Sequence, residues 1–480
     1  MATMNTLTQG LELSSSQLGS KRTAGIVTPA LVGGFATAVG MWCVWFLGHL
    51  PALALPPQVN VPALLICMVV GMWLTGRSVG QETGWKVGGV AGILTSLINL
   101  LILGAHLAQP PQADKQPLPG FEGFTPSAAL VGIGFLALGA VVGVVFGAIG
   151  SRGVAASVHE PRVWVARFAV VNVVAIVPLL LIGGSVTSTA SGMAVPGWPS
   201  SYGANMFLYP ITLMSQPRVF LEHTHRLFGS MVGLTTLVSM VLVLVFDRTR
   251  FVRVWAVVAF VLVLGQGYLG GQRVNSVSIK LAMVHGVAAQ LFFAFVVALA
   301  AYLSVAYIKA ARADAVDGDR KRKIFATGLL HATIVQLLLG ATYRHFGQQT
   351  GQMHALWAHA AWSMVVVVFA LLAGFTIRSR FSSDGLVPLF QRVGVGLIAV
   401  VGVQFMLGWW AFFVVVNAGP RGGAPLHDQL ETAKPIDAMT ALVATAHQAN
   451  GALLLALATL AIVFTRRVWK ANPTAVLATA

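Results

Sequence analysis

The run SAALVGIGFLALGAVVGVVFGAIG, residues 127–150, contains no charged side chain. About 20 apolar residues suffice for a helix to cross the hydrocarbon core of a bilayer. Eleven further runs of this kind occur along the chain, so the sequence predicts an all-α polytopic membrane protein with about 12 transmembrane helices. The approximate limits of the twelve runs are 24–49, 61–77, 86–107, 127–150, 165–188, 224–246, 252–270, 281–306, 324–342, 355–376, 392–416 and 441–465.

Composition supports this class. Hydrophobic residues make up 56% of the 480 residues and charged residues 9%, whereas soluble domains carry about 25% charged residues. The net charge of +16 sits in short loops, where it sets topology, so no nucleic-acid partner is expected. Placing the N-terminus in the cytoplasm puts 22 of the 30 Lys and Arg residues on the inner side. This bias predicts that both termini are cytoplasmic.

Cysteine chemistry is excluded by number and position. The two cysteines, Cys43 and Cys67, lie in separate apolar runs. They provide neither a disulfide framework nor a cysteine-based metal site.

A short motif recurs at the predicted outer ends of four spans, which indicates an internal repeat. Each motif ends in glycine and is followed by an outer segment and a span that begins with a histidine. The four copies are Leu179–Gly183, Gln266–Gly270, Gln336–Gly340 and Gln404–Gly408. The repeat predicts two four-helix halves, residues 164–323 and 324–480, preceded by a four-span region, residues 1–163, whose sequence indicates no chemistry.

The histidines of these hairpins are His225, His285, His359 and His447. An ionisable side chain within a membrane helix is costly and is by default a candidate functional residue. Two histidines per half suit a haem iron, which takes one axial ligand from each face. No acid or cysteine cluster accompanies them, which disfavours zinc. The alternative is that they are structural histidines that bond neighbouring helices.

The two halves differ beside their first histidine. Glu222, His225 and Arg226 share one helix face in the first half, whereas Leu356 and Ala360 take the places of the two charged residues in the second half. An acid beside a haem permits proton chemistry, so Glu222 is the catalytic candidate. The alternatives are that Glu222 only forms an ion pair with Arg226, and that Arg226 binds a haem propionate.

Four motifs, in this order, resemble the haem A synthase family over about residues 165–465. They are Thr187–Pro199 in an outer loop, Glu222-His-Thr-His-Arg226, Gln266–Arg273 and Met283–Gln290. The resemblance implies two four-helix bundles related by pseudo-twofold symmetry. It also implies oxidation of a ring methyl of haem O to a formyl group, which yields haem A for terminal oxidases.

The resemblance also implies roles for residues. His225 and His285 would face the substrate haem O, Glu222 would be the essential acid, and His359 and His447 would ligate a cofactor haem b. His354 is the alternative to His359, which aligns better with His225. This sequence departs from the family in two places. Ser200 and Ser201 stand in a loop where many bacterial relatives carry a cysteine pair, and Gly197 replaces an acid.

The family places such a protein in a bacterial-type inner membrane, with haem sites near the outer face. Its partners would be the lipid bilayer, haem O and an electron donor that the sequence does not identify, with haem O synthase or oxidase assembly proteins as further candidates. Three other functions remain open: a quinol-linked di-haem b electron carrier, a non-catalytic haem-binding assembly factor and a transporter. Only the enzyme requires Glu222, and a transporter would be colourless.

Overall fold

The computed structural model describes residues 25–107, 124–155, 160–209, 214–310, 319–378, 387–419 and 422–468. Within these ranges twelve helices are long and apolar enough to cross a membrane, and no β-strand is present. The predicted all-α polytopic class is therefore confirmed. Most of the two termini, residues 1–24 and 469–480, lie outside the described ranges, so their predicted cytoplasmic location stays a prediction.

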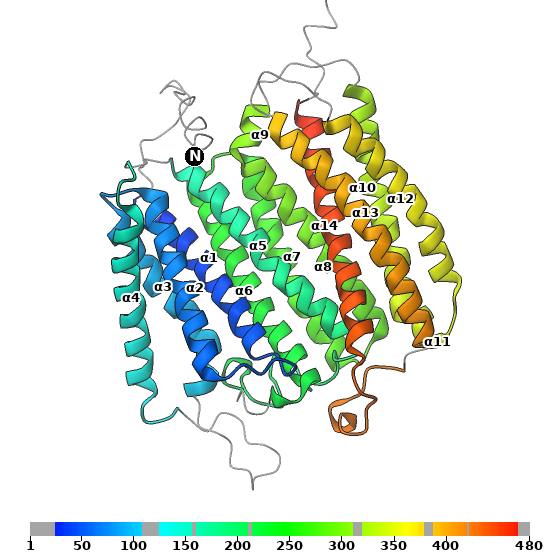
Figure 1. Cartoon of the computed structure of the whole chain (residues 1–480), viewed down its shortest axis with the longest axis horizontal. Helices are drawn as coiled ribbons and strands as arrows, with labels where there is room; N and C mark the ends of the chain where they lie inside the picture. The colour runs from blue at the N-terminus through cyan, green and yellow to red at the C-terminus, as the bar shows by residue number, and fades with distance from the viewer. Residues whose placement is uncertain are drawn as a thin grey trace, which may run out of the picture.

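The first four helices form a bundle at one end of an elongated molecule (Figure 1). They are α1 (Val27–Gly48), α2 (Pro57–Val79), α3 (Gly84–Leu107) and α4 (Ala128–Ser151). Glycines hold α3 and α4 together: a Cβ added at Gly92 would overlap the carbonyl oxygen of Gly139. Small residues at such contacts let two helix backbones approach closely, which maximises van der Waals packing where lipid removes the hydrophobic driving force.

Gly92→Ala is therefore expected to destabilise this bundle. The new methyl group meets backbone, which yields less easily than a side chain, and overpacking of this kind costs about 1–3 kcal/mol. The matched control is Gly134→Ala on α4, where a Cβ meets nothing within 4 Å. Thermal unfolding in detergent should show a lower midpoint for Gly92→Ala only. Equal midpoints for the two variants would contradict the close α3–α4 contact.

The remaining helices form two rings of four in the same order along the chain. The first ring contains α5 (Pro161–Ser188), α6 (Pro217–Phe246), α7 (Arg250–Asn275) and α8 (Ile279–Leu303), and the short α9 (Val305–Ala310) follows it. The second contains α10 (Asp319–Thr342), α12 (His354–Arg378), α13 (Val387–Asn417) and α14 (Ala438–Val468). In each ring, helices adjacent in this order pack together and the last closes on the first, as the internal repeat predicts.

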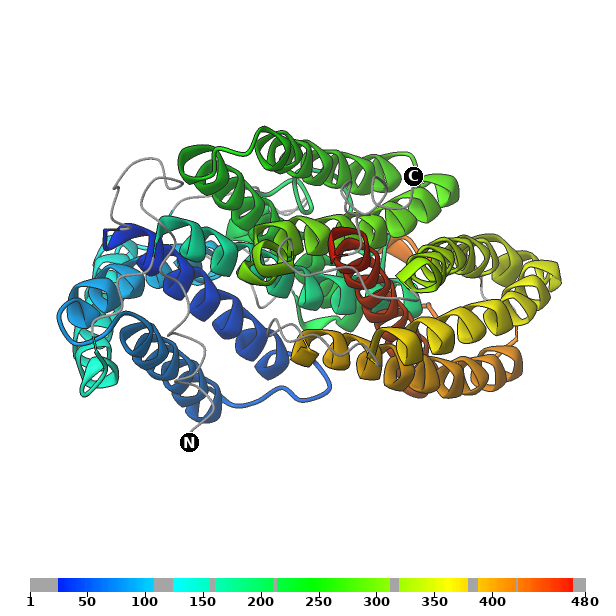
Figure 2. The same cartoon turned by 90° about the horizontal axis from the view of Figure 1, so that it is seen from above.

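Figure 2 shows the three groups side by side, with the first ring between the four-span bundle and the second ring. Contacts of α14 with α5 and α8 join the two rings. After α10 the helix continues through a π-helical turn, η4 (Tyr343–Gly347), into α11 (Gln348–Thr350). The long connections after α5 and α13 lie at the same end of the molecule, the lower end in Figure 1.

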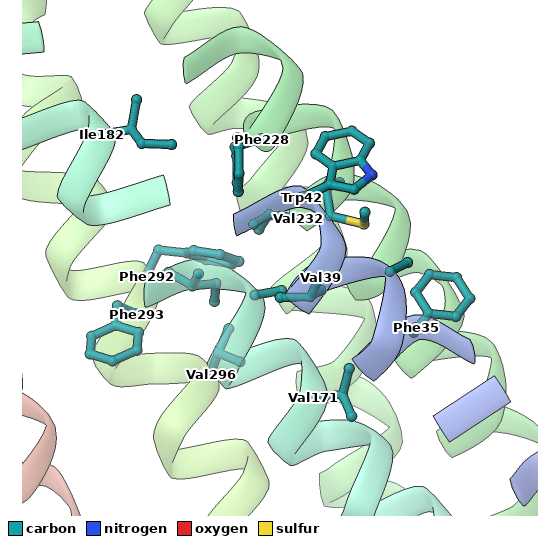
Figure 3. Packing of buried hydrophobic residues seen from close by; sticks show 14 of the residues in the cluster. Phe35, Val39, Trp42, Val171, Ile182, Phe228, Val232, Phe292, Phe293 and Val296 are labelled. Atoms are coloured by element: carbon teal, nitrogen blue, oxygen red, sulfur yellow. The ribbon is translucent and has the colours of Figure 1, made fainter. Parts of the chain in front are cut away.

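Helix α1 attaches the four-span bundle to the first ring (Figure 3). Trp42 of α1 meets Phe228 of α6 edge-on, with ring centroids 5.4 Å apart, and Phe35 of α1 meets Phe168 of α5 at 5.2 Å. These side chains belong to one buried cluster that extends to α8. The four-span bundle is therefore packed into the core of the first ring.

Several helices extend beyond the apolar runs from which they were predicted. Helix α6 begins at Pro217 instead of 224, and α7 continues to Asn275 instead of 270. The runs ended where polar side chains begin, but the backbone hydrogen bonds continue through those residues. The repeated glycines therefore lie inside their helices and do not end them.

Candidate functional site

The four predicted histidines meet as two pairs. His225 of α6 faces His285 of α8 with ring centroids 6.4 Å apart and planes at 85°. His359 of α12 faces His447 of α14 at 6.1 Å and 78°. In each ring the two helices are diagonal neighbours, so each pair points into the centre of its ring. We refer to these as the first pair and the second pair.

The repeated glycines make room for these imidazoles. A Cβ on Gly183 would lie 2.9 Å from Cε1 of His225, and one on Gly340 would lie 2.8 Å from Cε1 of His359. Gly270 and Gly408 stand in the same relation to His285 and His447, each at 3.2 Å. The recurring glycine is thus explained by a ring that packs against the neighbouring helix.

Gly340→Ala is expected to displace the His359 ring. Supporting contacts of a metal-binding histidine affect metal affinity about 10- to 100-fold, so haem retention at the second pair should fall by about that factor. Gly402→Ala on α13 is the control, because a Cβ there meets nothing within 4 Å. Absorption spectra of the purified variants measure haem content. Unchanged haem in Gly340→Ala would refute this role for the glycine.

A backbone carbonyl orients the ring of His359. Nδ1 of His359 lies 3.1 Å from the carbonyl oxygen of Gln336, one turn before the glycine. A histidine that donates Nδ1–H to a carbonyl presents Nε2 as a ligand. In the first pair, Nδ1 of His225 and of His285 are buried without a partner of regular hydrogen-bond geometry, although the equivalent carbonyls of Leu179 and Gln266 face them.

Glutamine side chains surround the second pair. The Gln336 amide donates to the carbonyl oxygen of His359 at 3.0 Å and lies 3.3 Å from the ring nitrogen Nε2. The Gln404 amide lies 3.2 Å from Nδ1 of His447, and its oxygen accepts from Asn450 at 2.8 Å. Oε1 of Gln336 at the second pair and Oε1 of Gln266 at the first pair are both buried without a partner.

The separation of the rings fits a shared iron. A metal–imidazole bond of about 2 Å, plus about 1 Å from the bonded nitrogen to the ring centre, puts two axial imidazoles about 6 Å apart between centroids. The observed 6.4 and 6.1 Å agree with this value. Within the described residues, no group of three or more His, Cys, Asp or Glu side chains could hold a metal ion by itself. The donor set therefore suits a porphyrin iron, whose other four ligands belong to the porphyrin.

Glu222 and Arg226 form a buried ion pair beside the first pair. Nη2 of Arg226 donates to Oε1 of Glu222 at 3.0 Å and to the carbonyl oxygen of Val195 at 2.7 Å. Nη1 donates to the carbonyl oxygens of Gly197 and Ser200 at 2.8 and 3.0 Å. Arg226 thus holds the loop between α5 and α6, which we call the outer loop after its predicted side, against α6. The role of Arg226 as a propionate ligand stays a prediction. Oε2 of Glu222 is buried without a partner of regular hydrogen-bond geometry, although the backbone of Ala194 faces the carboxylate.

Tyrosines of the outer loop cover this ion pair. The Tyr202 hydroxyl donates to the carbonyl oxygen of Ala194 at 2.7 Å. The ring of Tyr209 stacks on that of Tyr202 with centroids 5.6 Å apart, and its centroid lies 5.0 Å from that of His223. Burial raises the pKa of Tyr202, and the negative charge of Glu222 raises it further. The hydroxyl therefore stays protonated and serves as a donor.

Two serines of this loop contact α6. The Ser200 carbonyl accepts from Arg226, and the Ser201 hydroxyl lies 3.1 Å from Nδ1 of the fully buried His223. These contacts fix the loop without thiol chemistry.

The second pair lacks an equivalent acid. Leu356, which replaces Glu222, is buried, and Ala360 follows one turn later on α12. His354, the alternative to His359, is exposed at the start of α12. The geometry thus places His359 opposite His447 and His354 away from them.

Two further residues reach the first pair that the sequence did not single out. Arg273, in the last turn of α7, is close enough to interact electrostatically with Glu222, His225 and His285. His345 comes from η4 in the second ring, and its Nε2 lies beside Gly286 of α8. The sequence did contain a sign of Arg273, because this residue ends the motif Gln266–Arg273. None of the other three repeats has a cation at the equivalent position.

Fold and site together define a polytopic membrane protein in which two similar four-helix rings each bring two histidines together at the ring centre. Residues 166–350 match the family model COX15-CtaA, described as cytochrome oxidase assembly protein. The match confirms the resemblance to the haem A synthase family over these residues. The matched residues include Glu222, His225 and His285, whereas His359 and His447 follow them. No curated protein and no solved structure matches the chain.

Proposed function

We propose that this chain is a haem A synthase, which oxidises a ring methyl of haem O to the formyl group of haem A. The observation that carries the proposal is the asymmetry between two otherwise similar histidine pairs. Both have the ring separation that suits a porphyrin iron, but among the residues that the structure describes only the first pair has a buried carboxylate beside it. Family membership of residues 166–350 supports the same function.

Each pair has its own porphyrin in this proposal. His225 and His285 hold the substrate haem O, and His359 and His447 hold a cofactor haem b. The bound haems supply the redox chemistry, and the protein supplies binding, orientation and electrostatics. The packing of α14 against α5 and α8 joins the two rings, which keeps the two centres at a fixed separation.

Glu222 handles protons at the first pair. Conversion of a methyl group to a formyl group breaks two C–H bonds and introduces one oxygen atom from water or dioxygen, and a base near the reacting carbon would accept a proton that is released. Oε1 of Glu222 is fixed by Arg226, whereas Oε2 is buried and has no partner of regular hydrogen-bond geometry. Oε2 is therefore the atom that accepts the proton. The outer loop, held by Arg226, excludes water from this carboxylate.

The haem content of the purified chain tests this function against the main alternative, a di-haem b electron carrier. The similar geometry of the two pairs would suit such a carrier. Chain purified from cells that also produce haem O should contain haem b together with haem O or its oxidised products. Two molecules of haem b per chain under those conditions would favour the carrier.

A further inference from the structure

The first pair carries a second guanidinium besides that of Arg226. Arg273 extends from the last turn of α7 to the outer loop, where its guanidinium packs against Gly192 so closely that a Cβ on Gly192 would overlap it. It is within electrostatic reach of Glu222 and also of His345 from the second ring. Arg273 therefore lies where the loop, α6 and the second ring converge on the first pair.

The hydrogen bonds of the two arginines differ. Arg226 donates four, to three loop carbonyls and to Glu222. In the part of the chain that the structure describes, the guanidinium of Arg273 has no hydrogen-bond partner. Arg273 is partly buried, and a guanidinium is shaped to bind a carboxylate through two parallel N–H donors.

The charges near the first pair do not cancel. Glu222 contributes one negative charge, and Arg226 and Arg273 contribute one positive charge each, so one positive charge is in excess. Leu356 and Ala360 leave the corresponding part of the second pair without charge. The first pair therefore favours a ligand that brings a carboxylate.

The internal repeat shows that this cation is specific to one hairpin. Arg273 lies three residues after Gly270. The residues three positions after the other three repeated glycines are Val186, Tyr343 and Ala411. Packing of the repeated hairpin therefore does not require an arginine at this position, which points to a role in the ligand of the first pair.

We propose that Arg273 binds a propionate carboxylate of the porphyrin held by His225 and His285. The inference rests on the proposed function, because it assumes that a porphyrin occupies the first pair. Two axial histidines fix the plane of the ring but leave it free to rotate about the axis through both nitrogens. An ionic contact away from that axis selects one rotation, and so determines which methyl group faces Glu222. Arg273 is thus a specificity-determining residue.

Porphyrin esters test this contact directly. Full-length chain purified with haem b at the second pair is titrated with haem O and, separately, with haem O dimethyl ester, and the bound porphyrin is quantified after extraction. Wild type should bind the free acid about 10- to 100-fold more tightly than the ester, as a charge-assisted hydrogen bond implies. Arg273→Gln should bring the two affinities within about threefold by weakening the free acid alone, and Arg273→Lys should restore part of the preference.

Lys280→Gln is the matched control. Lys280 is an exposed cation in the first turn of α8, which follows the last turn of α7, so its replacement should not change the preference for the free acid. Equal affinities of wild type for acid and ester would overturn the inference, and that comparison requires no variant to fold. Equal weakening of both porphyrins by Arg273→Gln would also overturn it, since Arg273 would then only balance Glu222. If neither porphyrin bound, the proposed function would fail as well.

Discussion

Glu222→Gln is expected to abolish haem A formation while leaving the protein folded and both haems bound. The amide has the shape of the carboxylate and still offers an oxygen to Arg226, so the contacts of Arg226 with the outer loop persist. It cannot accept a proton at the position of Oε2. Removal of a general base typically lowers the rate about 10²- to 10⁴-fold. Haem A per chain, measured by pigment extraction, should fall by at least the lower factor.

The control for this variant is Glu82→Gln, which removes an exposed carboxylate between α2 and α3. It changes the net charge equally and should not alter haem A formation. Wild-type levels of haem A in Glu222→Gln would leave Glu222 as a purely structural partner of Arg226. Glu222 would then not explain a difference in function between the two pairs.

His447→Ala is expected to remove the cofactor haem. Its imidazole is one of the two rings of the second pair. Alanine has no nitrogen that could bind a haem iron from this side. The bound haem should fall from two to one per chain, with the remaining haem at the first pair. Haem A formation should be lost too, because in the proposed function the second pair would hold the haem through which electrons pass.

His331→Ala controls for the loss of a histidine from a span. His331 is exposed, and its ring bonds only the Thr327 carbonyl of its own helix among the described residues. Its haem content should equal that of wild type. Full haem content in His447→Ala would show that His447 is not a ligand.

The membrane class and the pairing of histidines follow from simple sequence patterns. Twelve apolar runs were enough to predict twelve spans, because lipid requires a helix wherever such a run crosses it. The shared register of His225, His285, His359 and His447 predicted that they meet two by two, because repeated hairpins place equivalent residues at equivalent points in each ring.

Other parts of the site depend on contacts between distant segments. Arg226 was an obvious candidate from its place beside His225, but its partners are loop carbonyls about 30 residues earlier in the chain. Arg273 can be recognised as a site residue only in the fold, where the loop brings Gly192 against it. The repeated glycines were interpreted as helix ends, because a sequence pattern does not show that a ring from the next helix packs there.

Pigment extraction from cells distinguishes a haem A synthase from a protein that only binds haem. The chain is co-expressed with haem O synthase in cells that lack their own haem A synthase, so that every other reactant is supplied by the cell. We expect haem A in cells with the wild-type chain and haem O alone in cells without it or with Glu222→Gln. Haem O that remains unchanged beside well-expressed, haem-loaded wild-type chain would refute the proposed function.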